Sequence, residues 1–165
     1  MNRRSLGAVV LFALLASGCA ITLTPASFGA KAPTVSGAWR GPIAVSSIAQ
    51  ENPHPRFNAN GTAFPVDLNL FSENLAELLS DSLQSAGVEI GSGGKSLRVE
   101  VVLLDFMFQG PCFVDYNVHL GDGKIFGQQT TGESVLFNRA CRMAFESAVS
   151  QILQDARIIG YLGEY

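Results

Sequence analysis

The sequence predicts an α+β domain, a two-layer sandwich in which two helices pack on one face of a mixed four-stranded sheet, in the order β-α-β-β-β-α. Segments 70–86 and 136–155 repeat apolar residues at the spacing of amphipathic helices. Segments 97–103 and 114–120 alternate apolar and polar residues, as strands do. The chain of 165 residues, 47% of them apolar, is long enough for one packed core and hardly for two. Elements that each bury one face must pack on one another, which gives two layers.

The chain begins with a pattern typical of a bacterial export signal. Two arginines precede an apolar run over 6–16, and small residues stand directly before Cys19. The run is roughly half of the ~20 residues that a transmembrane helix needs. A Cys in this setting is typical of a lipobox, so we expect residues 1–18 to be removed and Cys19 to carry acyl chains. A plain secretory peptide cut elsewhere and a short membrane anchor are the alternatives.

The residues around Cys19 also predict a location. Ala20 follows it where an Asp would retain the protein at the inner membrane, so we expect the periplasmic face of the outer membrane. Removing residues 1–18 takes away two of the 11 basic side chains and none of the 14 acidic ones, which leaves a net charge of −5. Acyl chains rather than charge would therefore hold the protein to lipid. The acidic balance also argues against nucleic acid as a partner.

The mature chain divides into a tether and one domain. Residues 19–41 have many small residues, Pro and Gly, and no helical or alternating period, so we expect the lipidated Cys19 to be followed by a flexible tether. Residues 42–165 form the predicted domain, which opens with a strand over 42–49. The loop over 51–66 contains three prolines and is long for a compact domain; such loops are usually functional or mobile.

The first helix and the hairpin after it have clear boundaries. Asn69 or Ser72 is available as the N-cap of the helix over 70–86, and Gly87 is placed to end it. We expect Gly110-Pro111 to be a two-residue loop that joins strands 97–103 and 114–120. In that register, Leu103 faces Val118 and Val101 faces Leu120. A Gly-Asp-Gly turn then leads to a strand over about 124–131 and to the final helix.

Four stretches of this pattern resemble the YajG family of bacterial lipoproteins. They are residues 74–87, the strand over 96–105, the strand over 114–118 and the tail over 144–155, together with the lipobox. The resemblance implies an outer-membrane lipoprotein domain in the periplasm without assigned catalysis. The second hairpin is shorter here than in the family.

The residues that usually carry catalysis are sparse. Both histidines, His54 and His119, are most simply explained as solvated surface residues, and neither stands in a catalytic or metal-binding pattern. We expect no cofactor, no metal site and no enzyme activity.

Two features of the sequence do point to specific sites. The first is the cysteine pair that remains after lipidation of Cys19. Cys112 opens a strand, and Cys141 lies in the first two turns of the last helix at the same end of the sheet, so we expect a disulfide between them. Buried free thiols are the alternative.

The second feature is an apolar face on the side of the hairpin that points away from the helices. Five residues would form it and would offer a docking surface to a partner: Val102, Leu104, Phe106, Phe108 and Phe113. Alternatively, the 51–66 loop covers this face, with Phe57 and Phe64.

An anchor, a tether and a stable domain predict a lipid-anchored interaction or scaffold protein that acts without catalysis. The alternative is an auxiliary lipoprotein of an envelope transport system that binds lipid or substrate. In either case we expect the membrane, through the lipid anchor, and an envelope protein or lipid as partners.

Overall fold

The computed structural model describes residues 23–35, 37, 39, 41–53, 56–59, 62–107 and 109–163. The export signal, Cys19, His54 and Phe108 lie outside these residues. The elements, in chain order, are η1 (Pro25–Ser27), β1 (Ile43–Ser47), β2 (Arg56–Ala59), β3 (Thr62–Pro65), α2 (Leu68–Ser85), β4 (Lys95–Phe106), β5 (Pro111–Leu120), β6 (Ile125–Glu133), α3 (Phe137–Gln154) and α4 (Ala156–Gly163).

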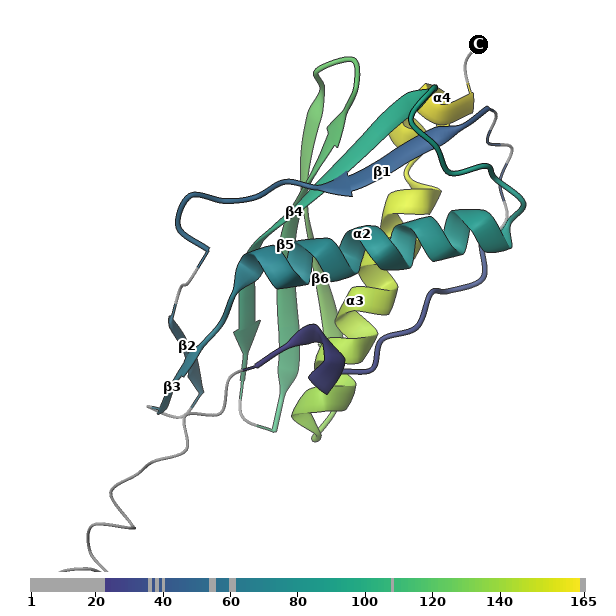
Figure 1. The fold of residues 1–165 in the computed structure, drawn as a ribbon. Coiled ribbons are helices and arrows are strands. Elements are labelled where there is room, and N and C mark those ends of the chain that lie inside the picture. Colours follow the sequence, from purple (N-terminus) through teal and green to yellow (C-terminus); the bar gives the residue numbers. More distant parts are fainter. Residues whose placement is uncertain are drawn as a thin grey trace, which may run out of the picture.

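Four of the strands form one mixed sheet with the order β1-β4-β5-β6. β1 runs parallel to β4, and the other two pairs are antiparallel. The helices α2 and α3 pack on one face of this sheet (Figure 1). The predicted two-layer α+β fold is therefore confirmed. The structure adds α4 after the last predicted helix, and a β2–β3 hairpin within the predicted 51–66 loop, with β2 in contact with β4.

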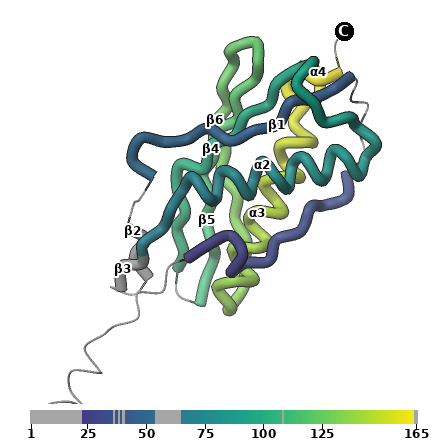
Figure 2. Tube along the Cα trace, in the orientation of Figure 1, coloured from purple at the N-terminus to yellow at the C-terminus, as the bar shows by residue number. Residues whose placement is uncertain are grey.

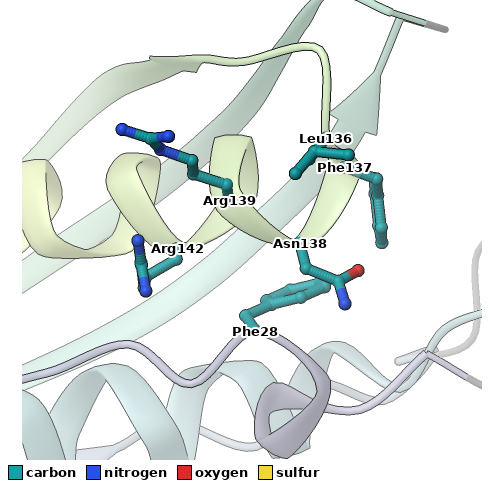
Figure 3. A pocket seen from close by; sticks show the side chains of 6 residues that line it. All are labelled: Phe28, Leu136, Phe137, Asn138, Arg139 and Arg142. Atoms are coloured by element: carbon teal, nitrogen blue, oxygen red, sulfur yellow. The ribbon is translucent and has the colours of Figure 1, made fainter.

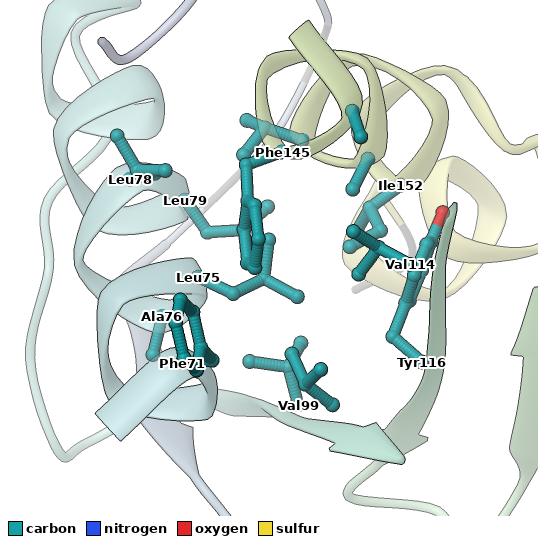
Figure 4. Close-up of a cluster of buried hydrophobic side chains, with 14 of the residues drawn as sticks. Phe71, Leu75, Ala76, Leu78, Leu79, Val99, Val114, Tyr116, Phe145 and Ile152 are labelled. Carbon is teal, nitrogen blue, oxygen red and sulfur yellow. The ribbon is translucent and has the colours of Figure 1, made fainter. Parts of the chain in front are cut away.

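The core fills the space between the two helices and the sheet (Figure 4). Phe71, Leu75 and Leu79 enter it from α2, and Phe145 and Ile152 enter from α3; all five are fully buried. On the sheet side, the alternate residues of β5 are buried one after another, which is the period of two that the sequence predicts. The helix–sheet interface is thus the main source of stability.

The polar residues at the start of α2 have a different role from the predicted one. Asp67 is the N-cap, and its side chain accepts a hydrogen bond from the backbone N of Asn69. Asn69 instead accepts from the backbone N of Gln50, and Ser72 accepts from the backbone N of Val101 at 2.8 Å. β1 pairs with β4 only as far as Val99. Beyond that point, these side chains accept hydrogen bonds from backbone N–H groups that no neighbouring strand pairs with.

The register of the β4–β5 hairpin corrects the predicted one. The turn takes four residues, 107–110, with Gln109 in the left-handed region at φ +52°, and Met107 N donates to Pro111 O. Leu97 pairs with Leu120 and Val99 with Val118, so the predicted Leu103–Val118 and Val101–Leu120 pairs are wrong. A bulge between Val101 and Leu103 then shifts the pairing by one residue and leaves both Val102 and Leu103 exposed.

The N-terminal segment from Leu23 onward packs on the domain, although the sequence predicts a tether over 19–41. Leu23 bridges to Val66 and is 8% exposed. The ring of Phe28 lies against Phe71 and Phe137, with centroid distances of 5.4 and 5.3 Å. Figure 2 shows this segment at the end of the domain where α3 begins. Isolated apolar residues, rather than a repeating pattern, anchor it, and periodicity does not reveal such anchors.

Candidate functional site

The bulge in β4 divides the apolar face that the sequence predicts. Leu104 and Phe106 point into the core, at 4% and 6% exposed, and the Phe106 ring packs edge-on against Phe137 at 4.6 Å. Val102 is exposed, and Phe113 is half-buried opposite Asp105. Phe108 lies outside the described residues. The structure thus does not bring Val102, Leu104, Phe106 and Phe113 together on one surface, because the extra residue at the bulge exchanges the two faces of the strand.

The face of the sheet that α2 and α3 leave uncovered carries polar side chains instead. On β4 and β5, Arg98 stands opposite His119, and Glu100 stands opposite Asn117. Asn117 Nδ2 donates to Glu100 Oε2 at 3.2 Å, and His119 Nε2 lies 3.6 Å from the same oxygen. The His119 and Glu100 side chains are 18% and 20% exposed, so both are largely covered rather than freely solvated, and His119 Nε2 makes no hydrogen bond to the described residues.

A shallow depression of about 360 Å³ continues this face toward β6. Asp115 and Gln129 line it, joined by a hydrogen bond from Gln129 Nε2 to Asp115 Oδ1 at 2.6 Å. Val102, at 39% exposed, adds an apolar contact at its edge. Charges of both signs, amide groups and one apolar spot are the chemistry of a polar docking surface.

The predicted disulfide is present and lies on the covered side of the sheet. Cys112 at the start of β5 and Cys141 in the second turn of α3 are bonded, with their Cα atoms 5.0 Å apart, and both residues are fully buried. Cys112 pairs with Gly132 of β6, where a Cβ would lie 2.0 Å from Ala140 O. Helix α3 therefore sits directly on β6 at the disulfide.

Sequence reasoning missed a polar network at the junction of α3 and α4. Tyr116 Oη donates to Gln128 Oε1 at 2.8 Å, and Gln128 Nε2 donates to Asp155 Oδ2 at 2.7 Å. The Arg157 guanidinium donates to the Asp155 carboxylate and holds the pKa of Asp155 at about 2. Burial raises the pKa of Tyr116, and the charge of Asp155 adds to this effect. A single Asp and a single Arg two residues apart gave no sequence signal of such a network.

We expect Asp155→Asn to weaken the domain at neutral pH by no more than about 1 kcal/mol, because the Asp155–Arg157 pair is partly exposed. The lowered pKa means that the native state favours the carboxylate, so this stabilisation is present above the ordinary Asp pKa and is lost as the pH falls toward 2. Urea unfolding of both proteins at pH 7 and pH 2.5 measures the difference. An equal difference at the two pH values would contradict the assignment.

The described part of the chain holds no group of three His, Cys, Asp or Glu side chains that could bind a metal ion. Within the same residues, no helix combines the length and apolar character needed to cross a bilayer.

Comparison with known proteins finds similarity to solved structures but assigns no family. The sequence matches no protein-family model and no curated protein. Among solved structures, the chain is similar to an uncharacterized protein, with a TM-score of 0.40 and 12% sequence identity over 74% of this chain and 98% of that chain.

Proposed function

We propose that this protein is a lipid-anchored lipoprotein of the outer membrane whose periplasmic domain binds another envelope protein without catalysing a reaction. One observation carries the proposal: two of the three cysteines, Cys112 and Cys141, form a buried disulfide, and the third is Cys19 of the lipobox. Structural disulfides persist in oxidising compartments such as the periplasm. The bond therefore supports export, and a lipobox acts only in an exported protein. The resemblance to YajG-like lipoproteins is in agreement with this proposal.

The uncovered face of the sheet supports the interaction role. Arg98, Glu100, Asn117 and His119 present charges and amide groups on one rigid surface, and side chains on strands are held more precisely than side chains on loops. A partner protein with a complementary polar surface fits this chemistry.

Lipidation is tested on the full chain expressed in a Gram-negative host. We expect the intact mass of the membrane fraction to correspond to a chain that starts at Cys19 and carries a diacylglyceryl group and an amide-linked acyl chain. Cys19→Ala should leave the uncleaved precursor, because the thiol that accepts the lipid is gone. Ala20→Asp, a change that keeps the thiol, should move the lipidated protein to the inner membrane. A mature chain without lipid would contradict the anchor.

The interaction role is tested by photo-crosslinking in intact cells. A photoreactive residue in place of Arg98, on the uncovered sheet face, should yield a discrete crosslinked band. The same residue in place of Glu73, which is also exposed but lies on α2, is the control and should yield none. Crosslinks of equal intensity from both positions, or from neither, would count against the sheet face as the docking surface.

A further inference from the structure

The fold places a tight limit on the distance between the domain and its lipid. Leu23 is buried and bridged to Val66, and Phe28 is fixed among aromatic rings of α2 and α3. Four peptide units separate Leu23 from Cys19, and an extended chain spans about 3.5 Å per residue, so the two Cα atoms lie no more than about 14 Å apart. If Cys19 is lipidated, as the proposed function states, the end of the domain that holds Leu23 and Phe28 lies close to the bilayer.

The same end of the domain exposes large apolar side chains. Met107 in the β4–β5 turn is 59% exposed, and Val135 and Leu136 between β6 and α3 are 74% and 64% exposed. We refer to Met107, Val135 and Leu136 as the apolar end.

Contacts between described residues place the apolar end beside the N-terminal segment. Leu136 and Phe28 line one surface hollow of about 440 Å³ (Figure 3). Val135 lines a second hollow together with Pro111 and the β4–β5 turn. Phe106, the residue before Met107, packs on Phe137, the residue after Leu136. The β4–β5 turn, the start of α3 and η1 therefore share one end of the molecule (Figure 1).

We propose that the apolar end lies in the headgroup region of the membrane that holds Cys19, so that the domain rests on the bilayer in one fixed orientation. Clustered exposed apolar residues on a folded domain mark an interaction site. A tether of this length holds the domain at an effective concentration on the order of millimolar next to lipid, so three side chains suffice where a free domain would need more.

Two cationic side chains beside the apolar end suit a lipid surface, although the exposed Glu133 lines the same hollow as Val135, and Glu146 lies 4.0 Å from Arg142. Arg139 and Arg142 project from the first turns of α3 beside Leu136 (Figure 3). An Arg side chain can keep its stem along apolar surface while its guanidinium reaches a lipid phosphate. The uncovered sheet face would then stand beside the membrane, rather than against it, and remain open to a protein partner.

The experiment places a fluorescent reporter at each end of the sheet. Trp39 is the one Trp of the chain, and Trp39→Phe gives a dark background; its Nε1 has no hydrogen-bond partner among the described residues, so the change leaves nothing unpaired. In this background, Leu136→Trp reports on the apolar end. Ile125→Trp is the matched control: Ile125 is 58% exposed, and it begins β6, whose nine residues place it about 26 Å from Glu133.

Both lipidated proteins are reconstituted into vesicles of phosphatidylethanolamine and phosphatidylglycerol, with acyl chains that are either plain or brominated. We expect brominated lipid to lower the fluorescence of the Leu136→Trp protein about twofold or more, since interfacial side chains reach the boundary of the acyl chains. The fluorescence of the Ile125→Trp protein should be unchanged. Thermal unfolding of both variants checks that the fold is kept.

The outcomes separate this inference from the proposed function. A chain that proves unlipidated by intact mass would contradict the anchor and this inference together. A lipidated Leu136→Trp protein that is not quenched would overturn the inference alone; contact of the apolar end with a second copy or another protein gives that result. Equal quenching of the Leu136→Trp and Ile125→Trp proteins would also overturn it, because the domain would then have no fixed orientation.

Discussion

Loss of the bond between Cys112 and Cys141 should lower the free energy of unfolding by about 3 to 4 kcal/mol. The bond closes a loop of 29 residues in sequence separation, and the chain-entropy model assigns a loop of this length about that much stabilisation. Loss of packing around the two buried sulfur atoms would add to the effect in a Cys112→Ala/Cys141→Ala protein. Urea unfolding of the oxidised protein and of the double variant measures the difference.

Reduction provides the control, because it breaks the bond and keeps both sulfur atoms. Dithiothreitol should destabilise the native protein and have no effect on the double variant. If reduction left the unfolding midpoint of the native protein unchanged, the cross-link would not contribute to stability.

Gly132→Ala should be the most damaging single replacement on β6. A Cβ at this position would lie 2.0 Å from Ala140 O and 2.6 Å from Ala144 N, and both are backbone atoms of α3 that cannot rotate away. The helix would have to move off the sheet beside the disulfide. We expect a loss of about 3 kcal/mol or more, which is about 6 to 12 °C in melting temperature for a domain of this size.

Gly127→Ala, on the same strand, is the matched control for Gly132→Ala. The nearest atom to a Cβ there is Asn117 Oδ1 at 3.2 Å, at the end of a surface side chain that can shift. Its melting temperature should stay close to that of the native protein. If the two variants melted at the same temperature, close packing of α3 on β6 would not explain the need for Gly132.

Two patterns in the sequence predict the layers of the fold. Leu75, Leu79 and Leu83 repeat at helical spacing, and each is fully buried in α2. Val114, Tyr116 and Val118 alternate with polar residues in β5, and each is fully buried. Because these patterns record which face of an element is covered, they predict layers and elements well.

The division of the predicted apolar face could not be predicted, because it depends on a single bulge. From Leu97 to Val101 the odd-numbered residues of β4 point inward, and from Leu104 to Phe106 the even-numbered residues do. A strand whose odd-numbered and even-numbered residues are both apolar can be covered on both faces, or it can contain a bulge and be covered on one face. The choice between them rests on hydrogen bonds to β5 and on the four-residue turn at 107–110, neither of which has a signal in the order of apolar residues.

The packing of Phe28 sets the order in which the domain can be completed. Its aromatic neighbours Phe137 and Phe145 lie more than 100 positions further along the chain. A chain is made from its N-terminus, so the segment around Phe28 appears early and must wait for α3 before it reaches all of its native contacts. Under the proposed anchor, any acylation of Cys19 that precedes the completion of α3 would therefore act on a segment that has not yet packed against that helix.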